Sequence, residues 1–588
     1  MSDVVPITTA IRAWRTVKPA DVPARDPRPD VAPPQWHRGM TLIGAVSLFI
    51  GTRSVWASAM SNRPSLAAVV SLCYAGILVT GVLALAARTS RALIRVDLAV
   101  LLIAVALTCC RLILSHNGSD EGVLTSYAAR ELLHGRPVYD QPWPWLFDRG
   151  VAITPTMDGG ADYTYGYPPL AVLLTAPVYA VVHGAGAATV VATGSLIAGT
   201  VALWILLPAP WRSAATAVCL GFGMLPTYAR LGYPAVTALA LLIPVVVRWP
   251  RTGAGGRLGR GGVLRAGCLG AACAAQQLPW FLIPFLLVGL YAVRRGELGN
   301  RRALAVLARY TGLAASTWLA INAYFAIQDF RGWVAGVTLL LRQGAIPHGQ
   351  GVVDISYYFT DGTGRLSFYT YGSVLLAAGL LTALALFVGR LGPALTVLPW
   401  CVFFFATRSQ DGYFLLMTPL WLAAAATVSA ADFRTAWRPR LPARLRGPGR
   451  RARAGRAAVL AGCLLPAVAC TCVAAASPPP LTFGIAPVHT DHGMLRRVVF
   501  EATNTTGKPL EPHFAIGVGQ STSRIWDVVS GPETLAPHQT ARYVIAGPDG
   551  GGRHVPDSHR VRVRLRAFSA HPQTVSSADI HVPDSERG

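Results

Sequence analysis

The sequence predicts a polytopic α-helical membrane protein that ends in a small β-sandwich. Hydrophobic residues make up 52% of its 588 residues and charged residues 14%, a balance typical of membrane proteins. Apolar runs recur between residues 39 and 476, many of them near the roughly 20 residues that a helix needs to cross a bilayer. From Pro478 onward, short alternating segments separated by turn residues indicate strands instead.

The apolar runs divide the chain into three parts. Residues 1–38 are rich in proline and charge and lack the apolar core of a signal peptide, which predicts a disordered cytoplasmic tail. Residues 39–476 form the predicted transmembrane domain, with about 12–14 spans. The number of spans between residues 167 and 248 stays open, because one run there must be broken or re-entrant, with Pro226 and Pro234 as the expected places. Residues 477–588 form the predicted β-sandwich.

The arginines indicate which ends of the spans face the cytoplasm. The net charge of +24 is concentrated in short connectors, which are typical of cytoplasmic loops: Arg88–Arg95, Arg248–Arg265, Arg294–Arg302 and Arg434–Arg456. We therefore expect a multi-pass plasma-membrane protein whose C-terminal domain, and whose loops at 115–170 and 328–370, face the outside. The same distribution argues against nucleic acid as a partner, since no basic module with interleaved aromatic residues is present.

The loop at 115–170 contains the clearest candidate for chemistry. Asp120 and Glu121 begin a predicted short helix that Gly135 and Pro137 end. Its apolar residues recur at helical spacing, which predicts a face that lies on an apolar surface: Val123, Leu124, Tyr127, Ala128 and Leu132. Two adjacent carboxyls at the start of such a helix would be partly desolvated at the membrane boundary, where a general base can be tuned.

A spaced set of motifs resembles the GT-C superfamily of polytopic glycosyltransferases, and within it most closely glycosyltransferase family 87. The set covers roughly residues 96–431 and comprises an acid pair, a G-x-P-x-Y segment, a Tyr-Pro-Pro segment that opens a span, and an RSQDGYF segment: Asp120 and Glu121, Gly135 to Tyr139, Tyr167 to Pro169, and Arg408 to Phe414. In one place the chain departs from the pattern. Relatives often carry a lysine where this chain has Gln276 or Gln277, which puts one expected phosphate contact in doubt.

This resemblance implies a GT-C-like fold and a sugar-transfer activity. The expected reaction moves mannose or arabinofuranose from a polyprenyl-phosphate donor to a glycan or glycolipid acceptor of the cell envelope, at the outer face of the membrane. A transporter or flippase is the main alternative, although it would place ionisable residues inside the spans and show related halves. A non-catalytic membrane scaffold that displays the β-sandwich is another alternative.

Such a transfer needs a base for the acceptor hydroxyl and cations for the leaving phosphate. Asp120 is the first candidate for the base, and its alternative role is that of an acid that complements the helix dipole. Glu121 either assists or faces solvent. The expected phosphate ligands lie near predicted external ends of spans, where interfacial anchoring is the alternative role: Arg408, His348, Arg342 and Arg230.

Further residues are expected to contact the sugar or its lipid phosphate. Tyrosines can stack on a sugar face, although tyrosines at this level also commonly mark the lipid headgroups. The resemblance adds polar positions near the spans. These expected substrate contacts are Tyr163, Tyr165, Tyr167, Asp411, Gln276 and Gln277. No cofactor is certain, and a divalent cation stays possible because an Asp-Glu pair can bind one.

The C-terminal domain is expected to bind carbohydrate and to be dispensable for the transfer step, because the sequence separates it from the external loops. Trp526, Tyr543 and Phe568 could offer a stacking face to a sugar. For Trp526 and Phe568, we favour a role in the core of the domain.

Overall fold

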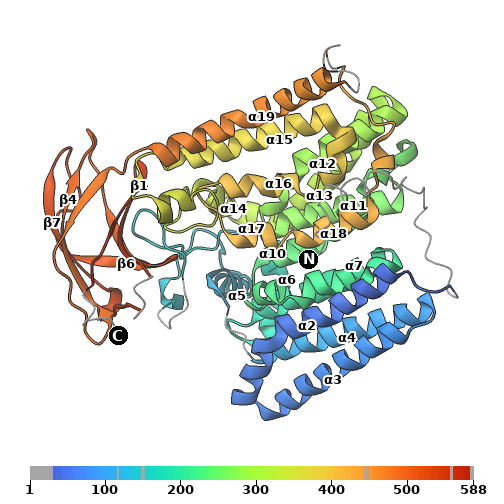
Figure 1. The fold of residues 1–588 in the computed structure, drawn as a ribbon, viewed down its shortest axis with the longest axis horizontal. Coiled ribbons are helices and arrows are strands. Elements are labelled where there is room, and N and C mark those ends of the chain that lie inside the picture. The colour runs from blue at the N-terminus through green and yellow to red at the C-terminus, as the bar shows by residue number, and fades with distance from the viewer. Residues whose placement is uncertain are drawn as a thin grey trace, which may run out of the picture.

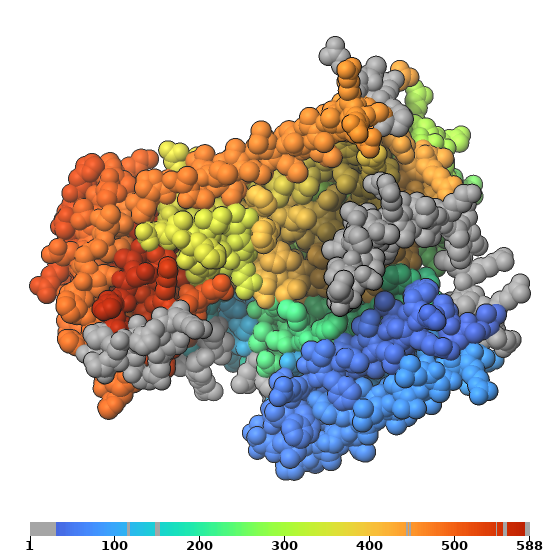
Figure 2. All heavy atoms as spheres, viewed as in Figure 1, coloured from blue at the N-terminus to red at the C-terminus, as the bar shows by residue number. Residues whose placement is uncertain are grey.

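The computed structural model describes residues 31–114, 118–147, 153–440, 442, 445, 449–556 and 561–582. Residues 1–30 of the predicted N-terminal tail lie outside this range, and so does Asp148 of the first loop. Residues 35–38 of the tail already belong to the first described helix, α2. Figure 1 shows a long helical body with a β domain at one end, and Figure 2 shows that domain, in orange and red, packed directly against the body.

The helical body fits the predicted membrane class. Eight described helices are long and apolar enough to cross a membrane: α2 (Gln35–Asn62), α3 (Pro64–Ala86), α4 (Ser90–Leu114), α7 (Ala187–Leu206), α12 (Leu278–Leu298), α13 (Asn300–Gln328), α15 (Ser367–Leu391) and α19 (Arg450–Ala476). Two shorter apolar helices are α6 (Leu170–Val182) and α10 (Pro234–Val246). Other described helices are α11 (Gly259–Ala275) and α14 (Phe330–Arg342).

Other predicted runs form chains of short helices instead of single spans. The run at 212–228 becomes α8 (Arg212–Thr216), the π-helical turn η3 (Ala217–Gly221) and α9 (Met224–Arg230). The apolar stretch at 391–431 contains the short helices α16 (Leu398–Cys401), α17 (Asp411–Leu415) and α18 (Thr418–Thr427). A count of about 12–14 spans therefore stays a prediction. The predicted break is confirmed at Pro234, which begins α10, whereas Pro226 lies inside α9.

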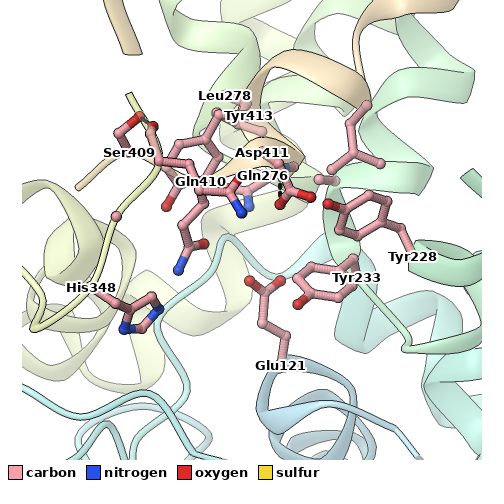
Figure 3. Close-up of a pocket in the computed structure, with 15 residues that line it drawn as sticks. Glu121, Tyr228, Tyr233, Gln276, Leu278, His348, Ser409, Gln410, Asp411 and Tyr413 are labelled. Carbon is pink, nitrogen blue, oxygen red and sulfur yellow. Dashed lines mark hydrogen bonds between the residues drawn. The ribbon is translucent and has the colours of Figure 1, made fainter. Parts of the chain in front are cut away.

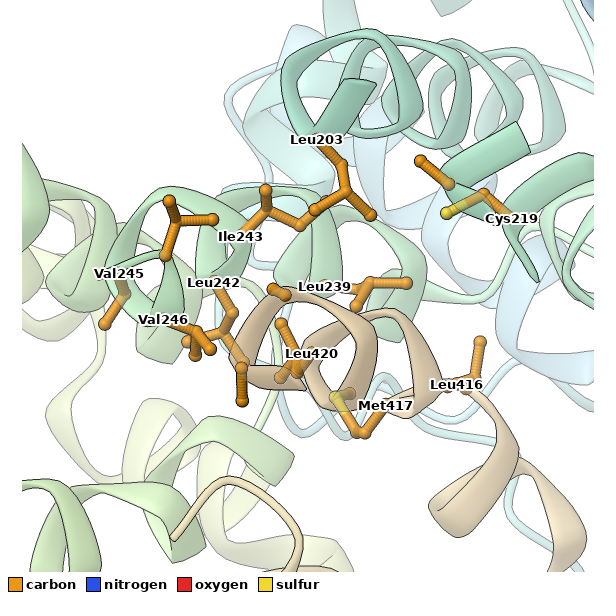
Figure 4. Packing of buried hydrophobic residues seen from close by; sticks show 14 of the residues in the cluster. Leu203, Cys219, Leu239, Leu242, Ile243, Val245, Val246, Leu416, Met417 and Leu420 are labelled. Atoms are coloured by element: carbon orange, nitrogen blue, oxygen red, sulfur yellow. The ribbon is translucent and has the colours of Figure 1, made fainter. Parts of the chain in front are cut away.

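These broken segments are buried in the largest apolar cluster of the described chain. Figure 4 shows residues from α7, η3 and α10 in contact with residues around α18: Leu203, Cys219, Leu239, Leu242, Ile243, Val245, Val246, Leu416, Met417 and Leu420. Because lipid is as apolar as these side chains, close van der Waals contact is what holds such segments together in a membrane. The cluster thus holds in place the segments on either side of α9 and the segment before α17, where the chain leaves the cluster.

The predicted helix of the first loop is confirmed as α5 (Asp120–Leu133). The side chain of Ser119 caps it by accepting a hydrogen bond from the Gly122 amide at 3.4 Å. Ser119 also donates from both its amide and its hydroxyl to the Leu231 carbonyl, at 2.9 and 3.0 Å. The start of α5 is thereby tied to the break between α9 and α10.

Two glycines allow this contact to be close. A Cβ atom at Gly122 would lie 2.4 Å from the Leu231 carbonyl oxygen, and one at Gly232 would lie 2.8 Å from the Gly122 Cα. Gly232 also has a φ of +81°, in the left-handed region that glycine adopts without strain. The backbones of the two segments therefore touch where the two carboxyls of α5 begin.

The predicted β domain at the C-terminus is confirmed as a curled antiparallel sheet, whereas its description as a β-sandwich stays a prediction. Its strand order is β1-β10-β9-β5-β6-β7-β4-β2: β1 (Gly362–Thr363), β2 (Leu481–Ile485), β4 (Arg497–Asn504), β5 (His513–Val518), β6 (Ser521–Ser530), β7 (Thr540–Ala546), β9 (Val563–Ala570) and β10 (Gln573–Asp579). A second small sheet pairs β3 (Met494–Leu495) with β8 (Arg553–His554).

The physical reason for the single sheet is the ten-residue strand β6. Its first part pairs with β5, and its second part pairs with β7, with a register shift in each ladder. Such irregularities bend and twist a strand, so β6 turns the corner that would otherwise separate two sheets. Trp526 is 2% exposed and lies in the core of the sheet, as expected. Phe568 is also buried, but it lies in the apolar cluster between the sheet and the helical body, where its ring contacts that of Tyr357, so its expected place in the core of the domain is wrong.

The sheet is completed by a strand from the helical body. Strand β1 belongs to the predicted loop at 328–370 and pairs with β10. Next to it, Arg564 forms an ion pair of 2.6 Å with Asp361 and donates to the Thr360 carbonyl at 2.9 Å. The Leu366 amide donates to the Gln573 carbonyl at 3.2 Å. The C-terminal domain is therefore joined to this loop, contrary to the separation expected from the sequence.

We expect Gly122→Ala to lower the apparent melting temperature of the purified protein by several degrees. The new Cβ would meet the Leu231 carbonyl, so the backbone must shift, and overpacking of this kind typically costs about 1–3 kcal/mol. The matched control is Gly194→Ala in α7, where an added Cβ would meet nothing within 4 Å. Equal melting temperatures for Gly122→Ala and Gly194→Ala would contradict the close contact.

Candidate active site

A cavity opens at the end of the helical body that faces the sheet, and we call it the main cavity. Its volume is about 210 Å³. Its walls come from five places in the chain: the start of α5, the break around α9, the junction between α11 and α12, the segment 348–350 and the segment 409–413. Figure 3 shows Glu121 pointing into this cavity from α5, with Tyr233 beside it and His348 on another wall.

Glu121 is the acid that faces the main cavity. Its Oε2 atom is buried without a hydrogen-bond partner, and the Tyr167 hydroxyl lies within hydrogen-bonding reach of the carboxyl. Burial first, and then the neighbouring charge of Asp120, raises the pKa of Glu121 from 4.5 to about 8, although Tyr167 and Arg408 oppose the rise. A carboxyl with this pKa exchanges its proton near neutral pH, as a general base must.

Asp120 is engaged in local hydrogen bonds. Its Oδ1 accepts from the Glu121 amide at 2.8 Å. Its Oδ2 accepts from the Thr154 amide at 3.0 Å and from the Thr154 hydroxyl at 2.6 Å. Both oxygens thus hold the loop around Thr154 against the start of α5. This geometry favours the alternative role of Asp120 as a helix-start acid and leaves Glu121 as the better placed base.

A smaller cavity of about 40 Å³, the inner cavity, lies beside the main one. Asp120, Asp162, Tyr167 and Arg408 line it, among others, and Glu121 lines both cavities. The two cavities are therefore neighbours that share the same carboxyl.

Arg408 provides a fixed positive charge at the inner cavity. Its guanidinium donates to the Gln343 Oε1 at 2.5 Å and to the Tyr413 hydroxyl at 3.3 Å, and it lies 3.9 Å from the Asp162 carboxylate. Burial alone would lower the pKa of Arg408, but Tyr413 and Asp162 outweigh it and raise the pKa. The group stays charged, and its fork carries more N–H donors than these contacts use.

Asp162 completes this network. Gln343 donates a hydrogen bond to its Oδ1. Burial raises the pKa of Asp162 while the Arg408 charge opposes that rise. The Asp162–Gln343–Arg408 group thus links the first loop to the RSQDGYF segment and orients the guanidinium.

The other expected phosphate ligands differ in their placement. His348 lines the main cavity, where burial, and then the Arg408 charge, lowers its pKa. It is therefore suited to act there as a neutral hydrogen-bonding group. Arg342 is an exposed residue at the end of α14, and Arg230 is a half-buried one at the end of α9. Neither arginine lines the main or the inner cavity.

The three expected tyrosines belong mainly to an apolar cluster under α5. Tyr165 is fully buried and donates to the Pro168 carbonyl at 3.1 Å, and Tyr163 contacts Phe147 with ring centroids 5.8 Å apart. Tyr167 also belongs to the cluster, but it borders the inner cavity beside Glu121. Of the three, only Tyr167 is placed to touch a substrate in either cavity.

The two glutamines between α11 and α12 have separate roles. Gln276 lines the main cavity. Gln277 donates from its Nε2 to the carbonyls of Gly166 and Val337 at 2.8 and 2.9 Å, so it ties the two loops together. Asp411 lines the main cavity at the start of α17, and it hydrogen-bonds Tyr228. Gln276 and Asp411 are thus at the site, and Gln277 supports it.

Several lining residues were missed by the sequence analysis. They are Tyr228, Tyr233, Gln350, Ser409, Gln410 and Tyr413. Ser409, Gln410 and Tyr413 belong to the RSQDGYF segment, so that motif contained the signal. Tyr228 and Tyr233 flank the break before α10, with ring centroids 5.3 Å apart. The predicted break at Pro226 and Pro234 indicated this region of the chain, but nothing in the sequence singled out the two tyrosines.

Among the described residues, no group of three or more His, Cys, Asp or Glu side chains is arranged to hold a metal ion. Dependence on a divalent cation therefore stays open. Comparisons of the chain with protein-family models, with curated proteins and with solved structures found no match. A role for the site thus rests on its geometry and chemistry.

The raised pKa of Glu121 predicts a specific dependence of stability on pH. The folded protein binds this proton more tightly than the unfolded chain does. Between pH 4.5 and about 8, the carboxyl is therefore ionised in the unfolded chain but still protonated in the folded protein, so the free energy of unfolding falls as the pH rises. We expect Glu121→Gln to be more stable than the wild type by a margin that widens as the pH rises through this interval, by at most about 1.4 kcal/mol per pH unit. Thermal unfolding at several pH values measures the margin.

The exposed Glu533 provides the control for this comparison. Glu533→Gln should differ from the wild type by an amount that does not change with pH. A pH-independent margin for Glu121→Gln would mean that the Glu121 carboxyl is solvated in the folded protein.

Proposed function

We propose that this chain is a GT-C-type glycosyltransferase. In this proposal it transfers a sugar, with mannose or arabinofuranose as the first candidates, from a polyprenyl-phosphate donor to a glycan or glycolipid acceptor of the cell envelope. One observation carries the proposal: two adjoining cavities contain both a buried carboxyl and a fixed guanidinium. The carboxyl is that of Glu121, whose Oε2 has no hydrogen-bond partner, and the guanidinium is that of Arg408.

The two groups match the two charges that move in such a transfer. The acceptor hydroxyl attacks the anomeric carbon, its proton passes to Glu121, and the bond from that carbon to the phosphate oxygen breaks. The polyprenyl phosphate leaves with the bonding electrons, and Arg408 stabilises the negative charge that grows on it. His348 and Gln410 are placed to donate hydrogen bonds to the same oxygens.

An apolar cavity supports a lipid-linked donor. It has a volume of about 360 Å³ and lies between α11, α12 and α13, with a lining that includes Cys273, Trp280 and Trp318. Trp280 donates to the Cys273 carbonyl at 2.9 Å, which spans the junction that holds Gln276. A polyprenyl chain in this cavity would therefore run toward the main cavity, where its phosphate is required.

The arginine connectors support the proposed orientation in the membrane. Two of them contact each other: Arg294 donates to the Pro250 carbonyl at 2.7 Å, and the Gly255 amide donates to the Glu297 carboxyl at 2.7 Å. A third lies beside them, since the Trp437 amide donates to the Ala292 carbonyl at 2.8 Å, two residues before Arg294. Connectors of this composition face the cytoplasm in membrane proteins. We infer that the main cavity and the C-terminal domain face the outside of the plasma membrane.

Glu121→Gln should lower kcat for sugar transfer by at least about a hundredfold, the usual size of a general-base contribution. Donor binding should change little, because the amide keeps the shape of the side chain. Transfer from synthetic polyprenyl-phosphate mannose and polyprenyl-phosphate arabinofuranose to envelope glycolipids measures the rate. The wild-type rate should rise with pH up to an apparent pKa near 8, and this limb should be absent in Glu121→Gln.

Asp120→Asn is the matched comparison. It disturbs the Thr154 contacts and lowers the rate, but it should retain the rise of rate with pH. If Asp120→Asn abolished that rise and Glu121→Gln retained it, Asp120 would be the base. If both variants kept the full wild-type activity on envelope glycans, the catalytic proposal would fail, and the transporter and scaffold alternatives would gain support.

The orientation is tested by labelling with a membrane-impermeant thiol reagent in a background without native cysteines. Cysteines at Gln350 and Glu533, both exposed, should react in intact cells. A cysteine at Arg260, in an arginine connector, should react only after the membrane is opened. Labelling of Arg260 in intact cells would mean that the orientation is inverted.

A further inference from the structure

A second polar cavity lies between the loops of the helical body and the C-terminal sheet, and we call it the hairpin cavity. Its volume is about 350 Å³. One wall is formed by Ile153, Pro155, Tyr358 and the segment 348–350, and the other by residues 520–524. The segment 348–350 also lines the main cavity. The hairpin cavity is therefore next to the site that holds Glu121, with a three-residue segment as their common wall.

The wall at 520–524 is the tip of the hairpin formed by β5 and β6. Val518 pairs with Ser521 across a turn of two residues, Gly519 and Gln520. Gly519 has a φ of +58°, as the first position of the tight turns favoured in such hairpins requires. The tip thus has a defined geometry and projects from the sheet toward the loops of the helical body.

Two arginines of the sheet hold this tip in place. Arg566 is fully buried, donates to the Thr522 hydroxyl, and has its guanidinium 4.7 Å from the centre of the Tyr358 ring. Arg553 donates to the Ser521 hydroxyl at 2.5 Å. Arg566 therefore contacts both walls of the hairpin cavity, one through Thr522 and the other through Tyr358. A site held by such contacts is preorganised, which lowers the entropy cost of binding.

The lining of the hairpin cavity fits a carbohydrate chain. It offers hydroxyls, amides, the guanidinium of Arg524, the imidazole of His348 and the ring of Tyr358, which are the groups that hydrogen-bond sugar hydroxyls and stack on sugar rings. None of its lining residues belongs to the long apolar helices. Most of its lining side chains are polar, so a polar polymer that enters from the sheet side would find hydrogen-bonding partners along it.

We propose that the β5–β6 hairpin belongs to the acceptor site of this protein. The hairpin cavity binds the sugar residues of the acceptor that adjoin its reacting sugar, while the attacking hydroxyl of that sugar lies in the main cavity near Glu121. The C-terminal domain then selects an oligosaccharide chain over a single sugar. This inference rests on the proposed sugar transfer, and it replaces the expectation that the domain is dispensable for that step.

The test uses the full-length protein with Gln520→Ala and Arg524→Ala combined, since both side chains are exposed on the hairpin cavity. Arg497→Ala on β4, exposed and outside the cavity, is the matched control. Acceptors are an alkyl glycoside of one sugar and linear manno- and arabino-oligosaccharides of several sugars. Loss of a few hydrogen bonds to the longer acceptor should lower kcat/KM for it, relative to the glycoside, about tenfold.

Direct binding separates this inference from the transfer reaction. Titration of the oligosaccharides into the protein without donor should give a Kd that the double variant weakens about tenfold and Arg497→Ala leaves unchanged. If wild-type protein transfers sugar but the double variant keeps both its Kd and its relative kcat/KM, the hairpin inference fails alone. If transfer is absent but oligosaccharide binding depends on the hairpin, the proposed reaction fails and the binding site stands. Absence of any oligosaccharide binding by the wild type would overturn the inference.

Discussion

The backbone contact between the start of α5 and the break before α10 fixes the geometry of the whole candidate site. Gly122 and Gly232 let the two segments touch, and Ser119 fastens them through the Leu231 carbonyl. This contact presents Glu121 to the main cavity and leaves Asp120 to bind the loop around Thr154. The pKa of the Glu121 carboxyl is raised because the surrounding segments hold this group away from water.

Features with a local physical cause could be predicted from the sequence. Helix α5 was predicted because its apolar residues recur at helical spacing and Gly135 ends it, and the break near Pro234 was predicted because proline disrupts a helix. The position of Trp526 in the core of the sheet followed from its size. The choice between Asp120 and Glu121 had no local signal, since it depends on Thr154 and Tyr167, which are distant in the sequence.

The relation between the two domains could not be predicted for a similar reason. Strand β1 consists of Gly362 and Thr363, too short a segment to show an alternating pattern. Its pairing depends on β10, and the ion pair of Arg564 with Asp361 forms because β10 lies between β1 and β9. In the sequence, four apolar runs and an arginine connector separate the loop at 328–370 from the C-terminal domain. The fold brings that loop and that domain into contact.

The pairing of β1 with β10 also affects how the chain assembles. An uncovered outer strand exposes a row of amide and carbonyl groups that can recruit another chain into aggregates. Here the segment that covers β10 is synthesised well before β10 itself and is carried by the helical body next to α15. The helical body thus supplies the segment that pairs with the middle of the last strand, and a C-terminal sheet made without that body would leave this stretch of β10 uncovered.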